Sequence, residues 1–341
     1  MISKIEIGAQ SLDILLAEKR PIALVADKGV ETVARYWAEK LQGQLFLLPG
    51  GEKIKTRKTK EQLEEALFHN RFGRDTLLVA MGGGALLDLA GFVAATYLRG
   101  ISTIYIPTTL LAMVDASIGG KTGINTKEGK NLLGTISHPE AILIDPLFLE
   151  TLPKAEYANG IAEMLKLGLV WDKTIWERLI RGERGEELIG ACVAGKCAVV
   201  EKDPQEKGLR RILNFGHTIG HALEWQSGYS MAHGRAVALG CVVESRLSAE
   251  LGYLNPLDAD AISEGFASLG FALKLPSIRP FFWDALSLDK KGVGKKERYV
   301  LIDQIGHALP FEGAFCTPIP KEVVQRALSD AIALLHNSFF V

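Results

Sequence analysis

The segment Asp75-Thr76-Leu77-Leu78-Val79-Ala80-Met81-Gly82-Gly83-Gly84 decides how the first half of this 341-residue chain is expected to fold. Its uninterrupted apolar run is typical of a strand buried on both faces, as in a parallel sheet. A helix is expected to begin near Ala85, directly after the glycines. A glycine turn between strand and helix lets the backbone approach a phosphate, which then faces the positive end of the helix dipole. The spacing is not Gly-x-Gly-x-x-Gly, so a phosphate site and a plain tight turn are both open interpretations.

Similar strand-like segments lie on both sides of this one, at residues 2–7, 21–26, 45–48, 103–106 and 141–144. Helical patterns separate them, first from residue 31 to 41 and then up to residue 70. Regular alternation of strand and helix is typical of a doubly wound parallel sheet. The first half of the chain is therefore predicted to be an α/β domain with a Rossmann-like parallel sheet.

Long helical patterns dominate the chain after residue 152. They cover residues 155–170, 173–181, 185–201, 212–226, 232–252 and 257–269, and an amphipathic helix is expected over 321–336. The β signal is confined to a short strand near residues 299–303. We therefore predict a domain boundary near residue 150, with a nucleotide-binding α/β domain at 1–150. The remainder, 151–341, is predicted to be an all-α domain that binds metal and substrate.

Composition excludes several classes of protein. A hydrophobic content of 48% with 23% charged residues is ordinary for a globular protein, and the net charge is −1. A near-neutral chain gives no electrostatic argument for binding nucleic acid or an anionic membrane, so an anion site must be a local basic cluster. Four cysteines without paired spacing do not make a disulfide framework. The start of the chain lacks a signal-peptide core, and no apolar run reaches the ~18 residues of a membrane span. We expect a soluble cytoplasmic protein.

The histidines suggest where chemistry could take place. His217 and His221 are four residues apart in a helical pattern, which places both on one helix face. His233 follows a predicted turn, and Glu163 lies upstream in another helical run. One carboxylate with two or three imidazoles suits zinc with an open coordination position. A pair of ordinary polar histidines is the alternative interpretation.

A second group of polar residues lies on glycine-rich loops of the first half. Residues 114–125 are expected to form a loop or hairpin that carries Asp115 and Lys121, and Lys130 and Asn131 follow. Basic residues on such loops suit an anionic ligand, although a solvated lysine patch is also open. Asp88, inside the helix after the glycine turn, suits a hydrogen bond to a ribose or nicotinamide, or simply balances the helix dipole.

Seven motifs occur together in the order and spacing of the 3-dehydroquinate synthase family. They are Gly82-Gly83-Gly84 with Asp88, residues 107–115, Gly119-Gly120-Lys121, Gly129-Lys130-Asn131, Ala162-Glu163 with Lys166, residues 213–217 with His221, and His233-Gly234. The sequence resembles this family over about residues 20–310. The wider fold group includes the sugar-phosphate cyclases that make inosose or valiolone rings and the zinc-dependent polyol dehydrogenases such as glycerol dehydrogenase.

The resemblance implies an enzyme that converts 3-deoxy-D-arabino-heptulosonate 7-phosphate into 3-dehydroquinate and phosphate, a lyase step of the shikimate pathway and aromatic amino acid biosynthesis. Bound NAD oxidises a ring hydroxyl, phosphate leaves by β-elimination, and the hydride is returned. Ring opening and an intramolecular aldol step then close the carbocycle. Zinc, for which cobalt can substitute, acts as a Lewis acid on the reacting oxygen.

The resemblance also implies a role for individual residues. Glu163, His217 and His233 would bind zinc, while His221 and Lys166 would face the substrate, His221 as a proton shuttle or hydrogen-bond donor. Anion contacts would come from Lys121, Asn131, Lys196, Arg210, Asn214 and one of Lys290 or Lys291. Arg99 would reach the active site of the neighbouring subunit in a homodimer. The NAD positions would be Asp27, Glu52, Lys55, Gly83, Gly84, Asp88, Thr108, Thr109, Asp115, Lys121 and Lys130. Asp27 and Glu52 would bind ribose hydroxyls, which disfavours NADP by charge repulsion.

The sequence departs from the family pattern at a few positions. Arg235 follows His233-Gly234 where the family usually has glutamate, so a charge near the zinc would be reversed, with Glu224 or Glu244 as compensating partners. Leu87 precedes Asp88 where glycine is usual. Two other enzymes remain alternatives, a related sugar-phosphate cyclase and a zinc- and NAD-dependent polyol dehydrogenase. The dehydrogenase would need no phosphate contacts. A non-catalytic protein that binds zinc or nucleotide would be favoured only if a ligand were missing, and none is.

Overall fold

The computed structural model describes residues 3–288 and 297–337, so Lys290 and Lys291 lie outside the described residues. The chain divides into two compact units by its contacts. The first comprises Met1–Tyr157 with Gly185–Val193, and the second comprises Ala158–Arg184 with Ala194–Val341. The assignment of nucleotide binding to residues 1–150 and of metal and substrate binding to 151–341 stays a prediction.

The first unit is built on a six-stranded parallel sheet in the order β1-β8-β5-β4-β2-β3. The strands are β1 Lys4–Ile7, β2 Ile22–Asp27, β3 Gln44–Leu48, β4 Leu77–Gly82, β5 Ser102–Pro107 and β8 Ala141–Ile144. All six residues of β4 are buried, as the continuous apolar run predicted. Val79 of β4 pairs with Leu24 of β2 on one side and with Ile104 of β5 on the other. The predicted parallel α/β architecture is confirmed.

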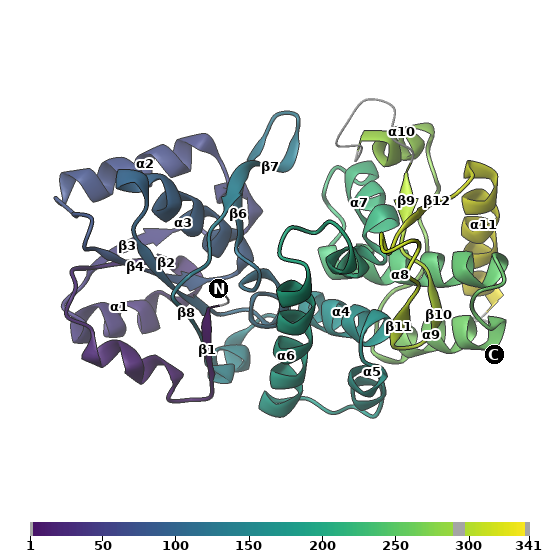
Figure 1. Cartoon of the computed structure of the whole chain (residues 1–341), viewed down its shortest axis with the longest axis horizontal. Helices are drawn as coiled ribbons and strands as arrows, with labels where there is room; N and C mark the ends of the chain where they lie inside the picture. The colour runs from purple at the N-terminus through teal and green to yellow at the C-terminus, as the bar shows by residue number, and fades with distance from the viewer. Residues whose placement is uncertain (1–2, 289–296, 338–341) are drawn as a thin grey trace. The chain divides into compact units, whose positions relative to one another are not determined.

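Helices cover both faces of this sheet (Figure 1). They are α1 Glu31–Lys40 on one face, and α2 Arg57–His69 and α3 Gly84–Thr96 on the other. A β-hairpin, β6 Lys121–Thr126 and β7 Gly129–Ile136, packs against α3. Trp37 of α1 joins the apolar side chains of β2, β4 and β5 in a core on the α1 face. The sheet core therefore holds the carboxyl ends of β2 and β4 in fixed positions.

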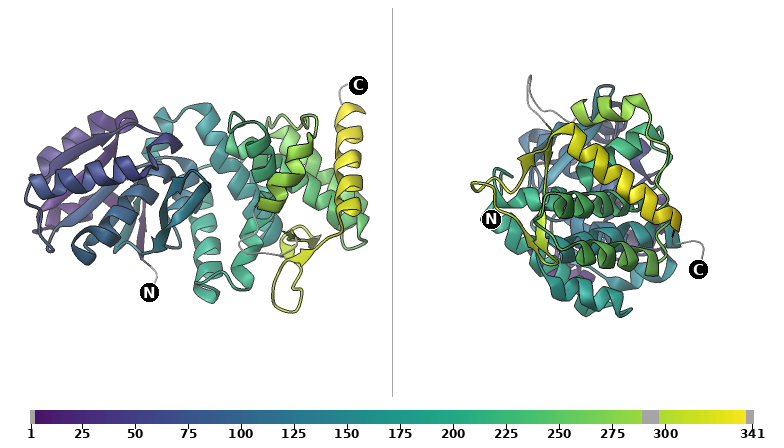
Figure 2. Two further views of the ribbon diagram at one scale, coloured as in Figure 1. Left: turned by 90° about the horizontal axis from the view of Figure 1, so that it is seen from above. Right: turned by 90° about the vertical axis from the view of Figure 1, so that its right-hand side faces the viewer.

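The second unit is mostly helical. Its helices are α4 Lys154–Val170, α5 Lys173–Ile180, α6 Glu186–Lys202, α7 His217–Gln226, α8 His233–Glu250, α9 Pro256–Ser268, α10 Pro280–Leu288 and α11 Lys321–Asn337. The first residues of α4 and α6 belong to the first unit. Helix α8 packs against α7, α9 and α11 (Figure 2). This arrangement makes α8, whose middle is fully buried, the centre of the unit.

Two predictions for the second unit need correction in detail. The predicted strand at 299–303 is divided into β9 Arg298–Tyr299 and β10 Ile302–Gln304, which pair with β12 Thr317–Pro318 and β11 His307–Ala308. The predicted helix at 212–226 is interrupted, because Gly216 adopts a left-handed conformation with φ 76°. A 3₁₀ turn, Leu209–Asn214, precedes that glycine, and α7 begins after it at His217.

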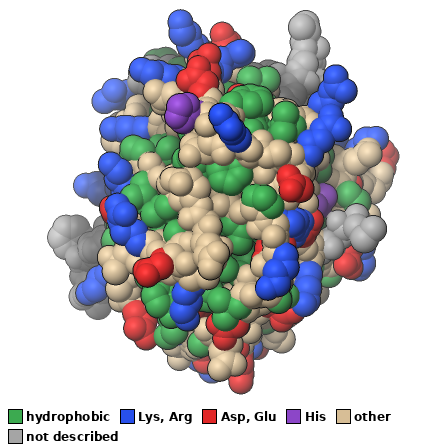
Figure 3. All heavy atoms as spheres, turned by 90° about the vertical axis from the view of Figure 1, so that its left-hand side faces the viewer, with side chains coloured by type: hydrophobic (Ala, Val, Ile, Leu, Met, Phe, Trp, Pro, Cys, Tyr) green, Lys and Arg blue, Asp and Glu red, His purple; other side chains and the backbone are tan. Residues whose placement is uncertain are grey.

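The surface agrees with the near-zero net charge. On the face drawn in Figure 3, basic and acidic side chains are interspersed. Within the described part of the chain, every helix is too short or too polar to cross a membrane.

Candidate functional site

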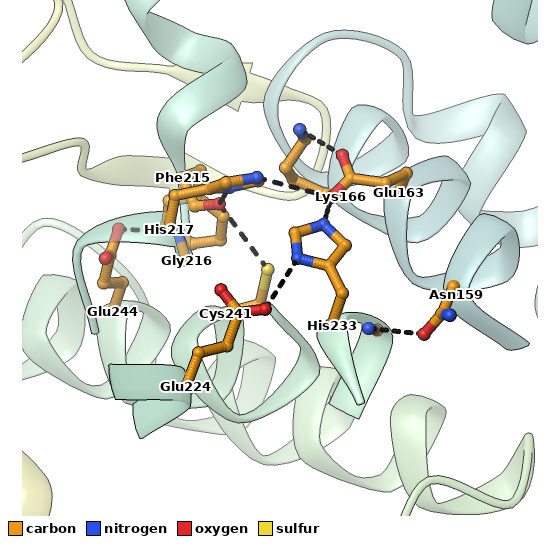
Figure 4. A network of polar contacts seen from close by, with 11 residues as sticks. Asn159, Glu163, Lys166, Phe215, Gly216, His217, Glu224, His233, Cys241 and Glu244 are labelled. Carbon is orange, nitrogen blue, oxygen red and sulfur yellow. Dashed lines mark hydrogen bonds and ion pairs between the residues drawn. The ribbon is translucent and has the colours of Figure 1, made fainter. Parts of the chain in front are cut away.

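Three side chains from three helices of the second unit point toward one another (Figure 4). Glu163 lies in α4, and His217 and His233 are the first residues of α7 and α8. Glu163 Oε1 is 3.4 Å from His217 Nε2 and 3.2 Å from His233 Nε2. One ligand atom from each residue lies within 4.8 Å of the other two. The structure thus brings together the three residues predicted to bind zinc.

Each histidine is oriented through its other ring nitrogen. His217 Nδ1 is 3.2 Å from the backbone carbonyl oxygen of Phe215, and His233 Nδ1 is 3.5 Å from Glu224 Oε1. Carbonyl and carboxylate partners of this kind fix the orientation of metal-binding histidines in proteins. Both Nε2 atoms are thereby directed at Glu163. One carboxylate and two imidazoles match the ligands of a zinc ion that keeps a coordination position open, so the donor set fits the implied metal.

The charges at this cluster are unusual for a buried site. Glu163 forms an ion pair with Lys166, one turn further along α4, and the two side chains are 2–3% exposed. Burial raises the pKa of Glu163, but Lys166 and His217 outweigh it and hold that pKa well below its usual range. Burial lowers the pKa of His233, yet hydrogen bonds to Glu163 and Glu224 raise it to about 10. A metal ion would therefore have to displace a proton from His233 when it binds.

His221 lies beside the cluster and outside the three-residue ligand set. Its ring centroid is 5.2 Å from that of His217, and its side chain is exposed. The i,i+4 spacing does place both histidines on one face, as predicted. His221 is thus available to a ligand in solution, while the His217 ring faces Glu163.

Further basic residues predicted to bind the substrate are buried in the same unit. Lys166, Lys196 and Arg210 are 2%, 6% and 3% exposed. Arg210 donates from Nη1 to the carbonyl oxygen of Pro204 at 3.1 Å. Asn214 donates from Nδ2 to Glu206 Oε1 at 2.8 Å. Glu206 was missed by the sequence analysis, because no motif or spacing distinguishes it from a solvated surface acid.

The first unit brings three of the other predicted residues together around Lys55, which was itself predicted. Its Nζ is 2.6 Å from Asp88 Oδ2 and 3.7 Å from Glu52 Oε1, and it also donates to Asn131 Oδ1. Lys55 is 2% exposed. Asn125, whose Nδ2 donates to Glu52 Oε1 at 2.8 Å, completes this polar group. The group links the loop after β3, helix α3 and the β6–β7 hairpin.

The glycine turn lies where the strand order of the sheet reverses. From β2 the chain moves outward to β3, and it then returns to place β4 on the other side of β2. Loops at the carboxyl ends of such neighbouring strands are the usual ligand sites of open α/β sheets. Asp27 ends β2, and a Cβ on Gly82 would lie 3.3 Å from the Asp27 Cβ. The turn and Asp27 therefore lie side by side.

The loop after β5 closes over the same turn. A Cβ on Gly83 would lie 3.2 Å from Thr109 Cγ2, and one on Gly84 would lie 2.8 Å from the Ala116 Cβ. Larger residues would crowd this loop, which includes Thr108 and a π-helical turn, Ala112–Ala116, that carries Asp115. Gly83 is the N-cap of α3 and has no side chain with which to cap it. Among the described residues no side chain caps the first turn of α3. An uncapped helix N-terminus suits a phosphate site.

The remaining predicted residues are Arg99, Lys121 and Lys130, and Arg235 is a residue that departs from the family pattern. Arg99 is exposed beyond the end of α3, with φ 71°. Lys121 is exposed at the start of β6, and Lys130 is half-buried in β7. Arg235 donates from Nε and Nη2 to the carbonyl oxygens of Ala272 and Lys274, each at 3.1 Å. The expected reversal of charge beside the zinc stays a prediction, and Glu224, one of the two compensating partners named for it, lies 3.5 Å from His233 Nδ1.

Comparison with known proteins gives a consistent result over most of the chain. Residues 45–159 match the model of the 3-dehydroquinate synthase N-terminal domain, and residues 160–292 match that of the C-terminal domain. A 3-dehydroquinate synthase from Synechococcus sp. is 42% identical over 295 residues, 82% of this chain and 79% of the relative. Another from Campylobacter concisus is 40% identical over 317 residues, 88% of this chain and 92% of the relative.

Solved structures show the same fold. The 2-epi-5-epi-valiolone synthase from Streptomyces hygroscopicus subsp. jinggangensis, with NAD+ and Zn2+ bound, is 26% identical with a TM-score of 0.86 and covers 98% of both chains. A 2-deoxy-scyllo-inosose synthase complexed with carbaglucose-6-phosphate, NAD+ and Co2+ is 24% identical, with a TM-score of 0.84 and coverage of 96% of both chains. With family models matching both halves and relatives of about 40% identity across most of its length, the chain belongs to the 3-dehydroquinate synthase family.

Proposed function

We propose a role for individual residues of this chain in the 3-dehydroquinate synthase reaction. In that reaction 3-deoxy-D-arabino-heptulosonate 7-phosphate gives 3-dehydroquinate and phosphate. The observation that carries the proposal is the convergence of Glu163, His217 and His233 from three helices. The 26%-identical valiolone synthase is described with NAD+ and Zn2+ bound, which supports the same two cofactors here. We assign zinc, with cobalt as a substitute, to the three converging side chains.

The metal ligands and their neighbours would act at the reacting end of the substrate. When bound, the ion supplies Lewis acidity to the hydroxyl that is oxidised and to the resulting ketone oxygen. Lys166 keeps the Glu163 carboxylate ionised, because its charge offsets the burial of that group. His221 is exposed one helical turn beyond His217 and can exchange a ring proton with solvent. We therefore assign proton transfer or hydrogen-bond donation to the His221 imidazole.

The remaining basic and amide side chains would hold the anionic groups of the substrate. Lys196 and Arg210 suit this role because they are buried cations, and the Asn214 amide is oriented by its hydrogen bond to Glu206. A polyol dehydrogenase has no phosphate to bind and no need for these cations. Lys121, Asn131 and either Lys290 or Lys291 are proposed for the same ligand. Arg99 would act in the neighbouring subunit of a homodimer.

The first unit would bind NAD, which supplies a hydride acceptor that is restored within each turnover. The pyrophosphate would lie on the glycine turn at Gly83 and Gly84, where the amides of α3 begin. Asp27 lies beside that turn and would accept hydrogen bonds from a ribose. The other proposed contacts are Glu52, Lys55, Asp88, Thr108, Thr109, Asp115, Lys121 and Lys130. This assignment gives nucleotide binding to residues 1–150 and the metal with most of the substrate contacts to 151–341, while Lys121 and Asn131 of the first region would also contact the substrate. We propose that the protein is cytoplasmic.

The test is phosphate release from the heptulosonate phosphate by purified protein with NAD+ and zinc, with and without a chelator, while absorbance reports NADH. We expect phosphate release that the chelator stops, without lasting NADH. Lasting NADH formed from glycerol or another polyol, without phosphate, would instead assign a dehydrogenase. Tight binding of NAD+ and zinc with neither product would assign a non-catalytic role.

A further inference from the structure

We propose that Asn159 and Glu244 are positioning residues that fix the geometry of the metal site. Each lies on one helix that carries a metal ligand and caps the N-terminus of another, α8 or α7, which begins with His233 or His217. This inference rests on the metal site proposed above. Neither residue touches the three ligand atoms in the contacts of the described chain. Both act on the backbone beside a ligand (Figure 4).

Asn159 links the helix of Glu163 to the helix of His233. It lies one turn before Glu163 in α4, and its Oδ1 accepts a hydrogen bond from the backbone N–H of Gly234 at 2.7 Å. Gly234 directly follows His233 in the first turn of α8, where backbone N–H groups have no partner within the helix. The N-cap residue of α8 is Ala232, which has no polar side chain to satisfy them. Asn159 supplies the missing acceptor from α4.

Glu244 links the helix of His233 to the helix of His217. It lies in α8, is 0% exposed, and its Oε2 accepts from the backbone N–H of Gly216 at 2.8 Å. Gly216 is the N-cap of α7 and directly precedes His217, and glycine has no side chain with which to cap the helix. The α8 side chain therefore supplies the cap that α7 lacks.

Two helix junctions are involved, that of α4 with α8 and that of α8 with α7. At both, the backbones are too close together for the helices to shift independently. A Cβ on Gly240 would lie 1.8 Å from the carbonyl oxygen of Gly216, and one on Gly234 would lie 2.6 Å from the Asn159 Cα. Close backbone contact at these glycines means that each cap holds its ligand residue in register with the neighbouring helix. The caps connect α4 to α8 and α8 to α7, so two hydrogen bonds, together with this close packing, join the three helices that carry the ligands.

A cap that served only helix stability would leave metal affinity unchanged in the folded protein. A positioning cap would not, because metal affinity depends on ligand geometry and falls about ten- to a hundredfold when supporting partners of ligands are removed. The distinguishing variants are Glu244→Leu and Asn159→Ala, which remove the acceptors. Glu244→Gln keeps an oxygen acceptor at the same place. Ser248→Ala is the control, since Ser248 is a buried polar residue one turn along α8 whose Oγ accepts from the Ile302 N–H and donates to the Glu244 backbone carbonyl, so its removal leaves the Glu244 carboxyl cap in place.

The experiment uses full-length protein stripped of metal and titrated with Co2+ alone. Visible absorption of the bound cobalt reports ligand geometry, competition with a chelator gives the affinity, and thermal unfolding without metal is measured in parallel. We expect Glu244→Leu and Asn159→Ala to weaken Co2+ binding about tenfold or more and to alter the cobalt spectrum. Glu244→Gln and Ser248→Ala should retain parental affinity and spectrum.

Parental affinity and spectrum in both Glu244→Leu and Asn159→Ala would overturn the inference. If Glu244→Leu does not fold, Asn159→Ala decides the question at the other junction. His217→Ala separates this inference from the proposal on which it rests. Loss of cobalt binding in His217→Ala shows that the parent binds at the proposed ligands, so unchanged positioning variants would then refute the caps alone. Unchanged binding in His217→Ala would refute the metal site itself and the inference with it.

Discussion

At the scale of single residues, the site depends on how one carboxylate is shared. Glu163 Oε1 faces His217 and His233, while Oε2 is paired with Lys166. A buried carboxylate remains ionised only when such partners offset the cost of burial. The two histidines of the i,i+4 pair are therefore not equivalent, because His217 faces Glu163 and His221 is exposed.

This difference predicts opposite effects of two alanine substitutions. His217→Ala should abolish stoichiometric zinc binding, because it removes one of three ligands. His221→Ala should keep the zinc and lower kcat by a factor of about 10² to 10⁴, the usual contribution of a positioned acid or base. Metal analysis of the two purified variants and phosphate-release kinetics provide the measurement. Normal zinc content in His217→Ala would disprove the ligand assignment.

The pairing of Lys166 with Glu163 predicts a stability effect. Lys166→Met leaves the Glu163 charge buried without its principal partner, which should lower the free energy of unfolding of the metal-free protein by about 3 kcal/mol. Lys60→Met is the matched control, because Lys60 pairs with Glu64 near the surface and should cost about 1 kcal/mol or less. Urea unfolding of metal-stripped protein measures both. Equal effects of the two variants would contradict the prediction.

The metal ligands could be predicted from the sequence, but the residues around them could not. Glu163, His217 and His233 belong to motifs with recognisable spacing. Asn159 and Glu244 have roles that exist only because α4, α7 and α8 meet, and nothing local to their positions indicates a contact 75 or 28 residues away. Arg235 is a similar case, because its hydrogen bonds to the backbone carbonyl oxygens of residues 272 and 274 exist only in the folded protein.

At the scale of elements, the hydrophobic periodicity of the sequence predicted where helices occur more accurately than it predicted where they begin and end. The predicted helix at 212–226 ignored Gly216, whose left-handed conformation separates a 3₁₀ turn from α7. A Cβ there would lie 2.6 Å from the Cys241 sulfur, so the close packing of α7 on α8 also requires glycine. The hydrophobic periodicity of a sequence does not predict where two helices pack this closely. The interruption matters because it makes His217 the first residue of α7.

The junction of α7 and α8 predicts a pH dependence of stability. Burial raises the pKa of Glu244 to about 8 in the folded protein, against 4.5 as its ordinary value. The folded state therefore holds this proton more tightly, and the protein loses stability as pH rises from 4.5 toward 8. Glu244→Gln keeps the acceptor and removes the titration. We expect the variant to match the parent near pH 5 and to become more stable than the parent as pH approaches 8.

The measurement is the free energy of urea unfolding of metal-stripped parent and variant across that pH interval. The difference should grow by up to about 1.4 kcal/mol per pH unit, the value of one fully linked proton. Groups that titrate in both proteins, such as His233, cancel in the difference. A constant difference from pH 5 to pH 8 would show that Glu244 is already ionised in the folded protein.

At the scale of the whole molecule, the sheet was predictable because its strands are buried on both faces. Continuous apolar runs such as β2 and β4 identify a parallel sheet without reference to any partner. The order of the strands in the sheet could not be predicted from these runs, because any apolar strand could occupy any position in the sheet. That order matters for function, because it places Asp27 at the end of β2 beside the glycine turn after β4.

The proposed homodimer predicts that two inactive variants restore activity when they form mixed dimers, which a monomer could not do. Arg99 is exposed in the first unit, and we propose that it acts in the active site of the neighbouring subunit. Arg99→Ala and His217→Ala should each inactivate the homodimer. In a mixed dimer, the Arg99→Ala subunit keeps His217 and receives Arg99 from its partner, so one of the two active sites is complete.

Mixing the two inactive variants under conditions that exchange subunits should therefore restore about a quarter of parental activity, since half of the dimers are mixed and each has one working site. Sedimentation of the parent provides the control for oligomeric state. If Arg99 acted within its own chain, neither site of a mixed dimer would be complete and no activity would return. Recovery of activity thus distinguishes an active site shared between subunits from a dimer of independent ones.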